Sequence, residues 1–280
     1  MKSLLRSLSL IIMLIIFYHA DCQTYSISNN IIDESDFYMM TKQMSQFFSR
    51  FNNEEDQYGV KYHPDSPEYR DNKRRAEILP ILFDSENPRT NGKLRDMFIA
   101  DVTSDEEHYM EFLGGEWFSE VSATFLWKNK PVSISLILTV EQENLGSKWV
   151  LTNVIFTEFN KMFPSGEMAE REKHFLHPMS HELDFFNIHK AFRNPQYIEY
   201  YSSKNYYPDY LTLFFYEIKN GNLTFENVDA VKFHIFQIGN WYFEVSWFNR
   251  TGHNAGWLIS NLIYLKDEEK ASLLKFYQPK

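Results

Sequence analysis

The sequence predicts an α+β protein made of two similar units, each with helices followed by a three-stranded antiparallel meander in a cone-like curved sheet. Helical periodicity predominates before residue 113 and again between 180 and 218. Runs rich in β-branched and aromatic residues predominate over 117–156 and 230–265. The residues from Trp149 to Phe156 also match those from Trp257 to Tyr264 in residue type, position by position. A duplicated unit explains this internal repeat.

Residues 1–22 have the pattern of a signal peptide. Lys2 and Arg6 supply the positive start, and an apolar run extends from Leu8 to Phe17. This run is shorter than the about 20 residues that a membrane-spanning helix needs, so we expect cleavage before Gln23. The predicted division is then a first unit at 23–160, a linker at 161–179 and a second unit at 180–280.

The signal peptide predicts an exported protein of the periplasm or cell envelope, or of the extracellular space. Cys22 is the only cysteine and lies in the signal segment, which excludes a disulfide and a catalytic cysteine in the rest of the chain. We expect contact with a membrane only if Cys22 is lipidated, and His19 and Asp21 match a lipoprotein signal poorly. The net charge of −10 argues against a nucleic-acid partner.

In the first unit, an apolar stripe predicts a helix from Ser35 to Phe51. Pro67 behind a Ser66 cap predicts a second helix that ends near Leu79, before Pro80. The acidic residues after Ser104 predict a third helix, which closes at Gly114 and Gly115. The expected strands of this unit are Trp117–Trp127, Val132–Val140 and Trp149–Phe156.

The second unit is expected to repeat this order after a polar linker segment at 160–173. Helices are predicted at 180–192, from Pro195, and at 208–218. The expected strands are Ala230–Gln237, Trp241–Phe248 and Gly256–Leu265, and a short helix over 267–276 closes the chain.

Strict alternation predicts which residues of the two matching strands share a face. In the first unit one face carries Trp149, Leu151, Asn153 and Ile155. In the second unit the equivalent face carries Trp257, Ile259, Asn261 and Ile263. We expect both tryptophans to enter the last strand of their meander with one face buried.

Helices that precede long antiparallel strands, with Trp149 and Trp257 entering the last ones, resemble the nuclear transport factor 2-like, or cystatin-like, cone fold. The chain also resembles uncharacterised exported proteins of Bacteroidetes-type bacteria, through the segments from His177 to Phe185 and from Asn254 to Ile259. The first resemblance implies a curved sheet that encloses a pocket. Because the cone fold hosts enzymes, small-ligand binders and assembly modules, it does not imply one function.

Histidines are the strongest candidates for metal ligands, and they are weak ones. His177, His181 and His189 lie in one region, yet the His-Glu pair at 181–182 lacks the second histidine of a zinc-protease helix. No phosphate-binding glycine loop and no nucleophile elbow occur, so no cofactor is expected. The basic run at 70–75, which includes Arg75, is interpreted as a solvated helix face.

The resemblance to the cone fold implies a ligand pocket enclosed by the curved sheet and the helices. In the second unit its expected lining is His234, Trp241, Glu244 and Trp247 of the meander. His234 and Glu244 fall on adjacent strands, where they form either an acid–base pair or a satisfied core pair. The absence of a complete catalytic motif favours an exported, non-catalytic binding or assembly protein with a protein or small-molecule partner. The alternatives are a hydrolase or isomerase-like enzyme that uses the cone pocket, and a periplasmic component of a secretion or conjugation machine.

Overall fold

The computed structural model describes residues 41–278, apart from 105–107, 145, 164–171, 177–187, 204 and 252–253. These residues fall in one compact unit. The helices are α3 (Met44–Phe51), α4 (Asn72–Ile78), η1 (Leu79–Leu82), α5 (Lys93–Val102), α6 (Thr157–Met162), α8 (His189–Arg193), η3 (Pro195–Tyr201), α9 (Tyr210–Lys219) and α10 (Asp267–Tyr277). The strands are β1 (Trp117–Trp127), β2 (Lys130–Glu143), β3 (Gly146–Ile155), β4 (Leu223–Ile235), β5 (Trp241–Phe248) and β6 (Gly256–Tyr264).

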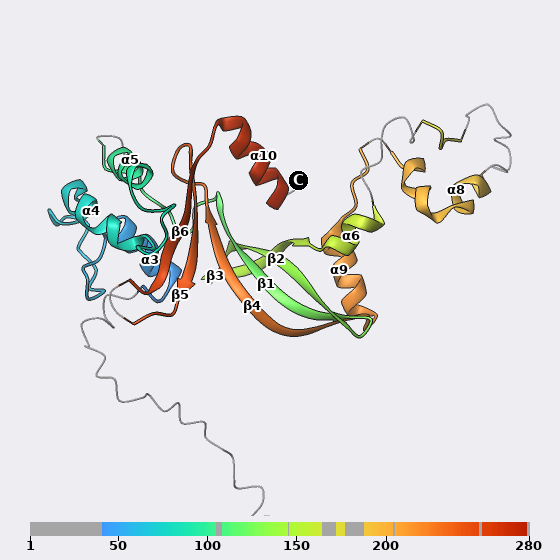
Figure 1. Cartoon of the computed structure of the whole chain (residues 1–280), viewed down its shortest axis with the longest axis horizontal. Coiled ribbons are helices and arrows are strands. Elements are labelled where there is room, and N and C mark those ends of the chain that lie inside the picture. Colours follow the sequence, from blue (N-terminus) through green and yellow to red (C-terminus); the bar gives the residue numbers. More distant parts are fainter. Residues whose placement is uncertain are drawn as a thin grey trace, which may run out of the picture. The chain divides into compact units, whose positions relative to one another are not determined.

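The six strands form one curved antiparallel sheet in the order β3-β2-β1-β4-β5-β6 (Figure 1). The α+β class and the strand order of both predicted meanders are confirmed, and β1 and β5 have the predicted bounds. The prediction for β4 is wrong at both ends, because the strand begins at Leu223 instead of Ala230 and ends at Ile235 instead of Gln237. The meanders do not form separate sheets, because β1 pairs with β4 along its whole length, from Trp117 opposite Ile235 to Trp127 opposite Leu223. The division into two domains stays a prediction.

The strand register divides the side chains between two faces. The front face carries Trp117, Phe233 and Phe243, which lie on one side of neighbouring strands in register. The back face carries Phe118 and His234, which lie opposite each other as the pair that follows Trp117 and Ile235 along β1. Because side chains alternate along a strand, these pairs assign most of the remaining strand residues to the front or the back face.

Two helical groups cover separate parts of the front face. Side chains of α3, η1 and α5 pack on Phe233 and Phe243 in one cluster of buried residues. Phe214 of α9 packs on Phe125 and its neighbours in a second cluster. The helices that precede the first meander thus cover mainly strands of the second, and α9 covers mainly strands of the first. The hydrophobic core is therefore shared between the two halves of the chain.

The back face has its own smaller cover. Phe118, Ile137 and Tyr242 form a buried cluster there, and Leu273 and Tyr277 of α10 pack against it. The closing helix was predicted at 267–276, and α10 confirms it with one more residue at its end. Its packing leaves a layer of polar side chains enclosed between the sheet and the helix.

The first two helices begin later than the sequence predicts. Residue Thr41 is extended and bridges Gly256, and α3 begins at Met44, so the predicted helix is wrong over 41–43. Its predicted start at Ser35 lies outside the described residues. The second helix begins at Asn72 because Asp71, not Ser66, caps it through the backbone N–H of Arg74.

The third predicted helix is wrong where it is described. Residues 108–113 are not helical, because side chains of distant segments bind their backbone. Asn52 exchanges two hydrogen bonds with the backbone of Met110, at 2.8 and 2.9 Å, and Arg75 donates to the carbonyl of His108. The helix that does form here, α5, was not predicted. It ends at Val102, and residues 105–107 lie outside the described part.

Helix α6, which was not predicted, begins at Thr157 shortly after β3 and extends to Met162, two residues into the predicted linker at 161–179. In the second half, α8 and η3 lie within or next to the helical stretches that were expected, and Asp209 caps α9. The segments 164–171 and 177–187 lie outside the described residues, as does the signal peptide at 1–22.

The last strands do not alternate as predicted, because each contains a β-bulge. In β3 the register shifts between Leu151 and Asn153, and in β6 it shifts between Ile259 and Asn261. Each bulge moves the residues that follow it to the opposite face. Trp149 and Leu151 therefore share the front face, while Asn153 and Ile155 lie on the back.

Candidate functional site

A chain of four polar side chains crosses the back face from β1 to β5. His234 is fully buried, and its Nε2 lies 2.9 Å from a carboxylate oxygen of Glu120. Its Nδ1 lies 2.8 Å from the hydroxyl of Tyr242. That hydroxyl donates to Glu244 at 2.7 Å, so His234 and Glu244 are linked through Tyr242.

The donor and acceptor of each hydrogen bond at Tyr242 follow from its single hydroxyl hydrogen. The Tyr242 hydroxyl has one hydrogen, which it donates to Glu244, so its oxygen accepts from Nδ1 of His234. Nε2 faces the carboxylate of Glu120, which accepts when it is ionised. Both ring nitrogens of His234 therefore have a partner within the protein, Tyr242 at Nδ1 and Glu120 at Nε2.

The surroundings shift the pKa of each acid in the network. The hydrogen bond to His234 holds the pKa of Glu120 below its ordinary value. Burial acts to raise the pKa of Glu244, but hydrogen bonds from Tyr242 and Lys232 outweigh it and leave that pKa lowered. Burial raises the pKa of the Tyr242 hydroxyl, and it raises that of Tyr277 to about 12. Both carboxylates are therefore ionised, and both phenols keep their protons, at neutral pH.

The predicted pocket residues do not share a face. His234 and Glu244 lie opposite each other on the back face, as the strand prediction implied. Trp241 lies on the front face, is buried against Phe98, and donates to Asp101 at 2.7 Å. Trp247 also lies on the front face, but its side chain is 43% exposed. Trp241 is therefore a core residue, whereas Trp247 is accessible.

The sheet divides beside Trp247. Strand β4 pairs with β5 only from Lys232 to Ile235, so the residues of β4 before Lys232 have a partner on the β1 side alone. Two register shifts in this part of β4 leave Glu226 and Asp229 as extra residues opposite β1. Bulges increase the local twist of a strand, which explains why β4 continues with β1 and separates from β5.

A hollow of about 530 Å³ lies where the two strands separate, and we call it the fork pocket. Because no strand separates the faces at this point, its lining combines both. Trp247, Trp257 and Val231 come from the front face, and Glu120, Lys232 and Ser246 come from the back face. Lys232 also binds Glu244 at 3.0 Å, so the polar wall of the fork pocket is continuous with the His234 network.

Sequence reasoning missed Tyr242, Glu120 and Lys232. The signal for Tyr242 was present, since alternation along β5 places it on the same face as Glu244. Glu120 was out of reach, because it meets His234 only through the pairing of β1 with β4. The interpretation as two separate units excluded that pairing.

A second hollow, also of about 530 Å³, lies between α3, α4 and the start of β6. The buried pair Arg50 and Glu55, joined at 3.0 Å, is part of its lining, and Tyr58 and Ile81 are exposed at its edge. Burial raises the pKa of Glu55 and outweighs the opposing charge of Arg50. The two buried charged side chains of this hollow are thus paired with each other, and Asp56, Arg74 and Glu77 also line it.

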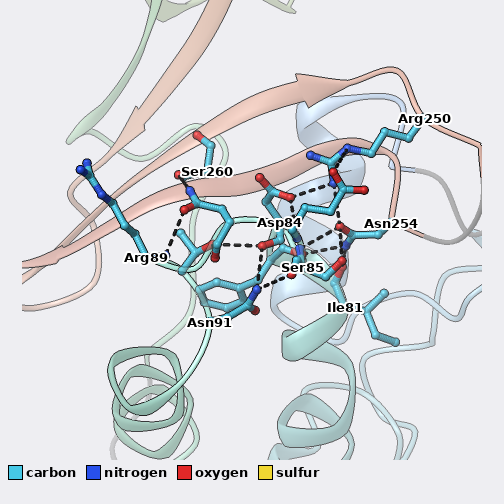
Figure 2. Close-up of polar contacts among 12 residues, drawn as sticks. Ile81, Asp84, Ser85, Arg89, Asn91, Arg250, Asn254 and Ser260 are labelled. Atoms are coloured by element: carbon cyan, nitrogen blue, oxygen red, sulfur yellow. Dashed lines mark hydrogen bonds and ion pairs between the residues drawn. The ribbon is translucent and has the colours of Figure 1, made fainter.

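Figure 2 shows the polar cluster that holds the loop after η1 against the β5–β6 hairpin. Arg250 binds the carboxylate of Asp84 at 2.8 Å. Asn254 accepts from the backbone and hydroxyl of Ser85 and donates to the carbonyl of Phe83 at 2.7 Å. Asp84 in turn donates its backbone N–H to Ile259 of β6. These contacts hold the loop after η1 against β6, beside the second hollow, and their role is structural.

In the described part of the chain, no three histidine, cysteine or acidic residues are placed to hold a metal ion. His189 lies on α8, whereas His177 and His181 lie outside the described residues. Among the described helices, none has the length and apolar character needed to cross a membrane.

Comparison with protein-family models, with curated proteins and with solved structures gives no match for this chain. The resemblance to the nuclear transport factor 2-like fold therefore stays a prediction. The fork pocket and the network beside it are the features of the molecule from which its function can be inferred.

Proposed function

We propose that this chain is an exported, non-catalytic binding protein and that the fork pocket is its ligand site. The observation that carries this proposal is that the histidine is enclosed while the fork pocket is open. His234 is bonded to Glu120 and Tyr242 beneath α10, whereas the exposed face of Trp247 and polar side chains, with Glu120 among them, line an open hollow. A concave site with an apolar wall and a few polar groups is typical of small-molecule binding.

The geometry disfavours the enzyme alternative. A general base must reach the proton that it abstracts, within about 3 Å or through one water. His234 has no exposed surface, and both of its ring nitrogens have partners within the protein. Its neighbours Phe118 and Tyr277 cover the ring, with centroids 4.9 and 4.6 Å away. His234 thus positions Glu120 and Tyr242 instead of contacting a ligand.

Export rests on the sequence of residues 1–22, which has the charge and length of a signal peptide. N-terminal sequencing of the protein recovered from the cell envelope or medium tests it. We expect the sequence to begin at Gln23. Recovery of the chain from the cytoplasm with Met1 intact would contradict export.

The two halves arose, we propose, by duplication of one helix-plus-meander unit. The two β-bulges support this, because Thr152 and Ser260 occupy equivalent positions three residues after Trp149 and Trp257. Each hydroxyl donates to a carbonyl of the neighbouring strand, at 3.2 Å from Thr152 and 3.3 Å from Ser260. Residue-type similarity between strands does not by itself require a matched bulge.

The order of the strands supports the same proposal. The order is symmetric about the central pair, so that β1 corresponds to β4, β2 to β5 and β3 to β6. Trp149 and Trp257, which the duplication makes equivalent, both lie on the front face. They flank Phe233, with ring centroids 6.0 and 4.9 Å away.

Affinity mass spectrometry of the purified protein against a broad metabolite library tests the binding proposal. We expect a bound compound whose retention is lost in Trp247→Ala. Trp149→Ala is the matched control, because Trp149 has the same exposed fraction of 43% but does not line the fork pocket. Turnover of a library compound that is abolished by Glu120→Gln, or binding that both tryptophan variants leave unchanged, would contradict the proposal.

A further inference from the structure

We infer that the fork pocket binds a neutral saccharide; this inference rests on the proposed binding function and names its ligand class. Three charged side chains line the fork pocket, Glu120, Lys232 and Asp229. Glu120 faces His234 at 2.9 Å, and Lys232 faces Glu244 at 3.0 Å, so these two are already paired. Asp229 remains, and it accepts from the side chains of Thr124 and Asn227.

This arrangement disfavours charged ligands. An anion would approach the carboxylates of Glu120 and Asp229, and a cation would approach the ammonium group of Lys232. A purely apolar ligand would cover these groups without replacing their hydrogen bonds to water, which is costly. The polar wall therefore suits an uncharged ligand that both donates and accepts hydrogen bonds.

The free edge of β4 also disfavours an added peptide strand. An extended peptide needs an uninterrupted row of backbone groups to continue a sheet. Glu226 and Asp229 are bulged and acidic, and natural proteins use bulges and charges of this kind to block strand addition. Recognition in the fork pocket thus depends on side chains.

The opposite wall completes the match to a sugar. Trp247 is exposed and packs edge to face on Trp257, with ring centroids 5.4 Å apart. The indole ring of Trp257 is held in place by its own N–H, which donates to the carbonyl of Lys42 at 3.2 Å. A pyranose ring has an apolar C–H face that packs on an indole and a rim of hydroxyls that pair with carboxylate, ammonium and hydroxyl groups. These two walls provide both surfaces.

Isothermal titration with neutral oligosaccharides tests the inference, using hexasaccharides of glucose, xylose, mannose and N-acetylglucosamine on the purified protein. We expect at least one to bind, with affinity about tenfold weaker in Trp247→Ala and unchanged in Trp149→Ala. Ser122→Tyr is a second variant, because Ser122 lines the fork pocket and a larger side chain fills it without removing an aromatic wall. It should weaken binding while the protein keeps its unfolding temperature.

The outcomes separate this inference from the proposed function. If no oligosaccharide binds but a metabolite of another class does, and Trp247→Ala abolishes that binding, the saccharide inference is overturned and the fork pocket remains a ligand site. If an oligosaccharide binds equally to all three variants, the sugar site is elsewhere and the inference is again overturned. If nothing binds in either experiment, both proposals fail.

Discussion

Buried charged side chains organise this protein at the scale of single residues. Arg75 has no exposed surface, and its guanidinium donates to the carbonyls of Phe51, Val102 and His108 at 2.8–3.2 Å. It also lies over the ring of Tyr109, with 4.6 Å to the centroid. The basic run around it was interpreted as a solvated helix face, which is wrong for Arg75. One planar side chain therefore joins three segments that are not hydrogen-bonded to one another in the sheet.

Replacing Arg75 with lysine should destabilise the protein by about 2–4 kcal/mol, because an ammonium group cannot reproduce the planar set of donors and leaves buried carbonyls unpaired. The free energy of unfolding in urea measures this. Arg74→Lys on the next residue is the matched control, because Arg74 is exposed, and it should change stability by less than about 0.5 kcal/mol. Equal effects of the two variants would contradict the role assigned to Arg75.

The Glu120–His234 contact predicts a dependence of stability on pH. Because the pKa of Glu120 is lower in the folded protein than its ordinary value of 4.5, ionised Glu120 stabilises the fold at pH values above 4.5. That contribution is lost as the pH falls through the lowered pKa. Glu120→Gln should therefore cost on the order of 1–3 kcal/mol near neutral pH, and its difference from the natural protein should shrink in acid.

Urea unfolding of both proteins at a series of pH values between about 7 and 3 measures this difference. Glu226→Gln is the control, because Glu226 is an exposed acid on β4 whose side chain forms no hydrogen bond or ion pair with the described residues of the site. A difference for Glu120→Gln that stays constant or grows toward acid would show that the ionised carboxylate is not what stabilises the network.

At the scale of elements, long-range side-chain contacts decide where helices begin and loops dock. The loop after η1 belongs to the first half of the chain, yet Asn254 and Arg250 of the β5–β6 connection hold it. Asn254 alone joins Ser85, Phe83 and Arg250. We expect this contact to determine the local stability of the loop.

Asn254→Ala should destabilise the protein by about 1–3 kcal/mol and raise amide exchange in residues 83–91 and at the start of β6, while exchange in β1 and β2 stays unchanged. Hydrogen exchange with mass spectrometry measures this pattern. Asn249→Ala, an exposed asparagine in the same connection, should leave exchange in the loop as it is. Uniformly faster exchange across the sheet would indicate global destabilisation and contradict a local role.

Strands were more predictable than helices because their pattern is local. The bounds of β1 and β5 could be predicted from the alternating pattern and from the tryptophan or phenylalanine at each end. Helix α5 escaped prediction because Gly92, with φ at 100°, precedes it in place of a capping side chain. The false helix after Ser104 followed a correct capping pattern, but Asn52 and Arg75 bind that backbone, and their positions depend on the tertiary fold.

The site was partly predictable for the same reason. The placement of His234 and Glu244 opposite each other follows from a short hairpin and was predicted correctly, although their side chains are linked only through Tyr242. The fork pocket depends on the bulges in β4 and on the pairing of β4 with β1. Neither has a pattern within one segment, so Glu120 and Lys232 could not be assigned to the site.

At the scale of the whole molecule, the two halves share their cores. Phe214 of α9 completes the cluster on β1–β3, and Phe98 of α5 completes the one on β4–β6. The pairing of β1 with β4 joins the halves at the centre of the sheet. Each of the two clusters therefore combines helices of one half of the chain with strands of the other.

Residues 23–160 expressed alone should therefore not fold, because β1 loses its partner β4 and the first meander loses the cover of α9. Co-expression with residues 161–280 should restore a folded complex, measured by circular dichroism and by co-purification. A cooperative unfolding transition and a dispersed amide spectrum for residues 23–160 alone would show that the first half is an independent domain, and the shared-core description would be wrong.

Crystals of the full chain soaked with a library of small fragments test the central claim, that the fork pocket is the ligand site. We predict that bound fragments gather against Trp247 and Trp257 and form hydrogen bonds with Lys232 or Ser122. Fragments that collect in the hollow beside Arg50 and Glu55, with none between β4 and β5, would contradict the claim and move the ligand site to that second hollow.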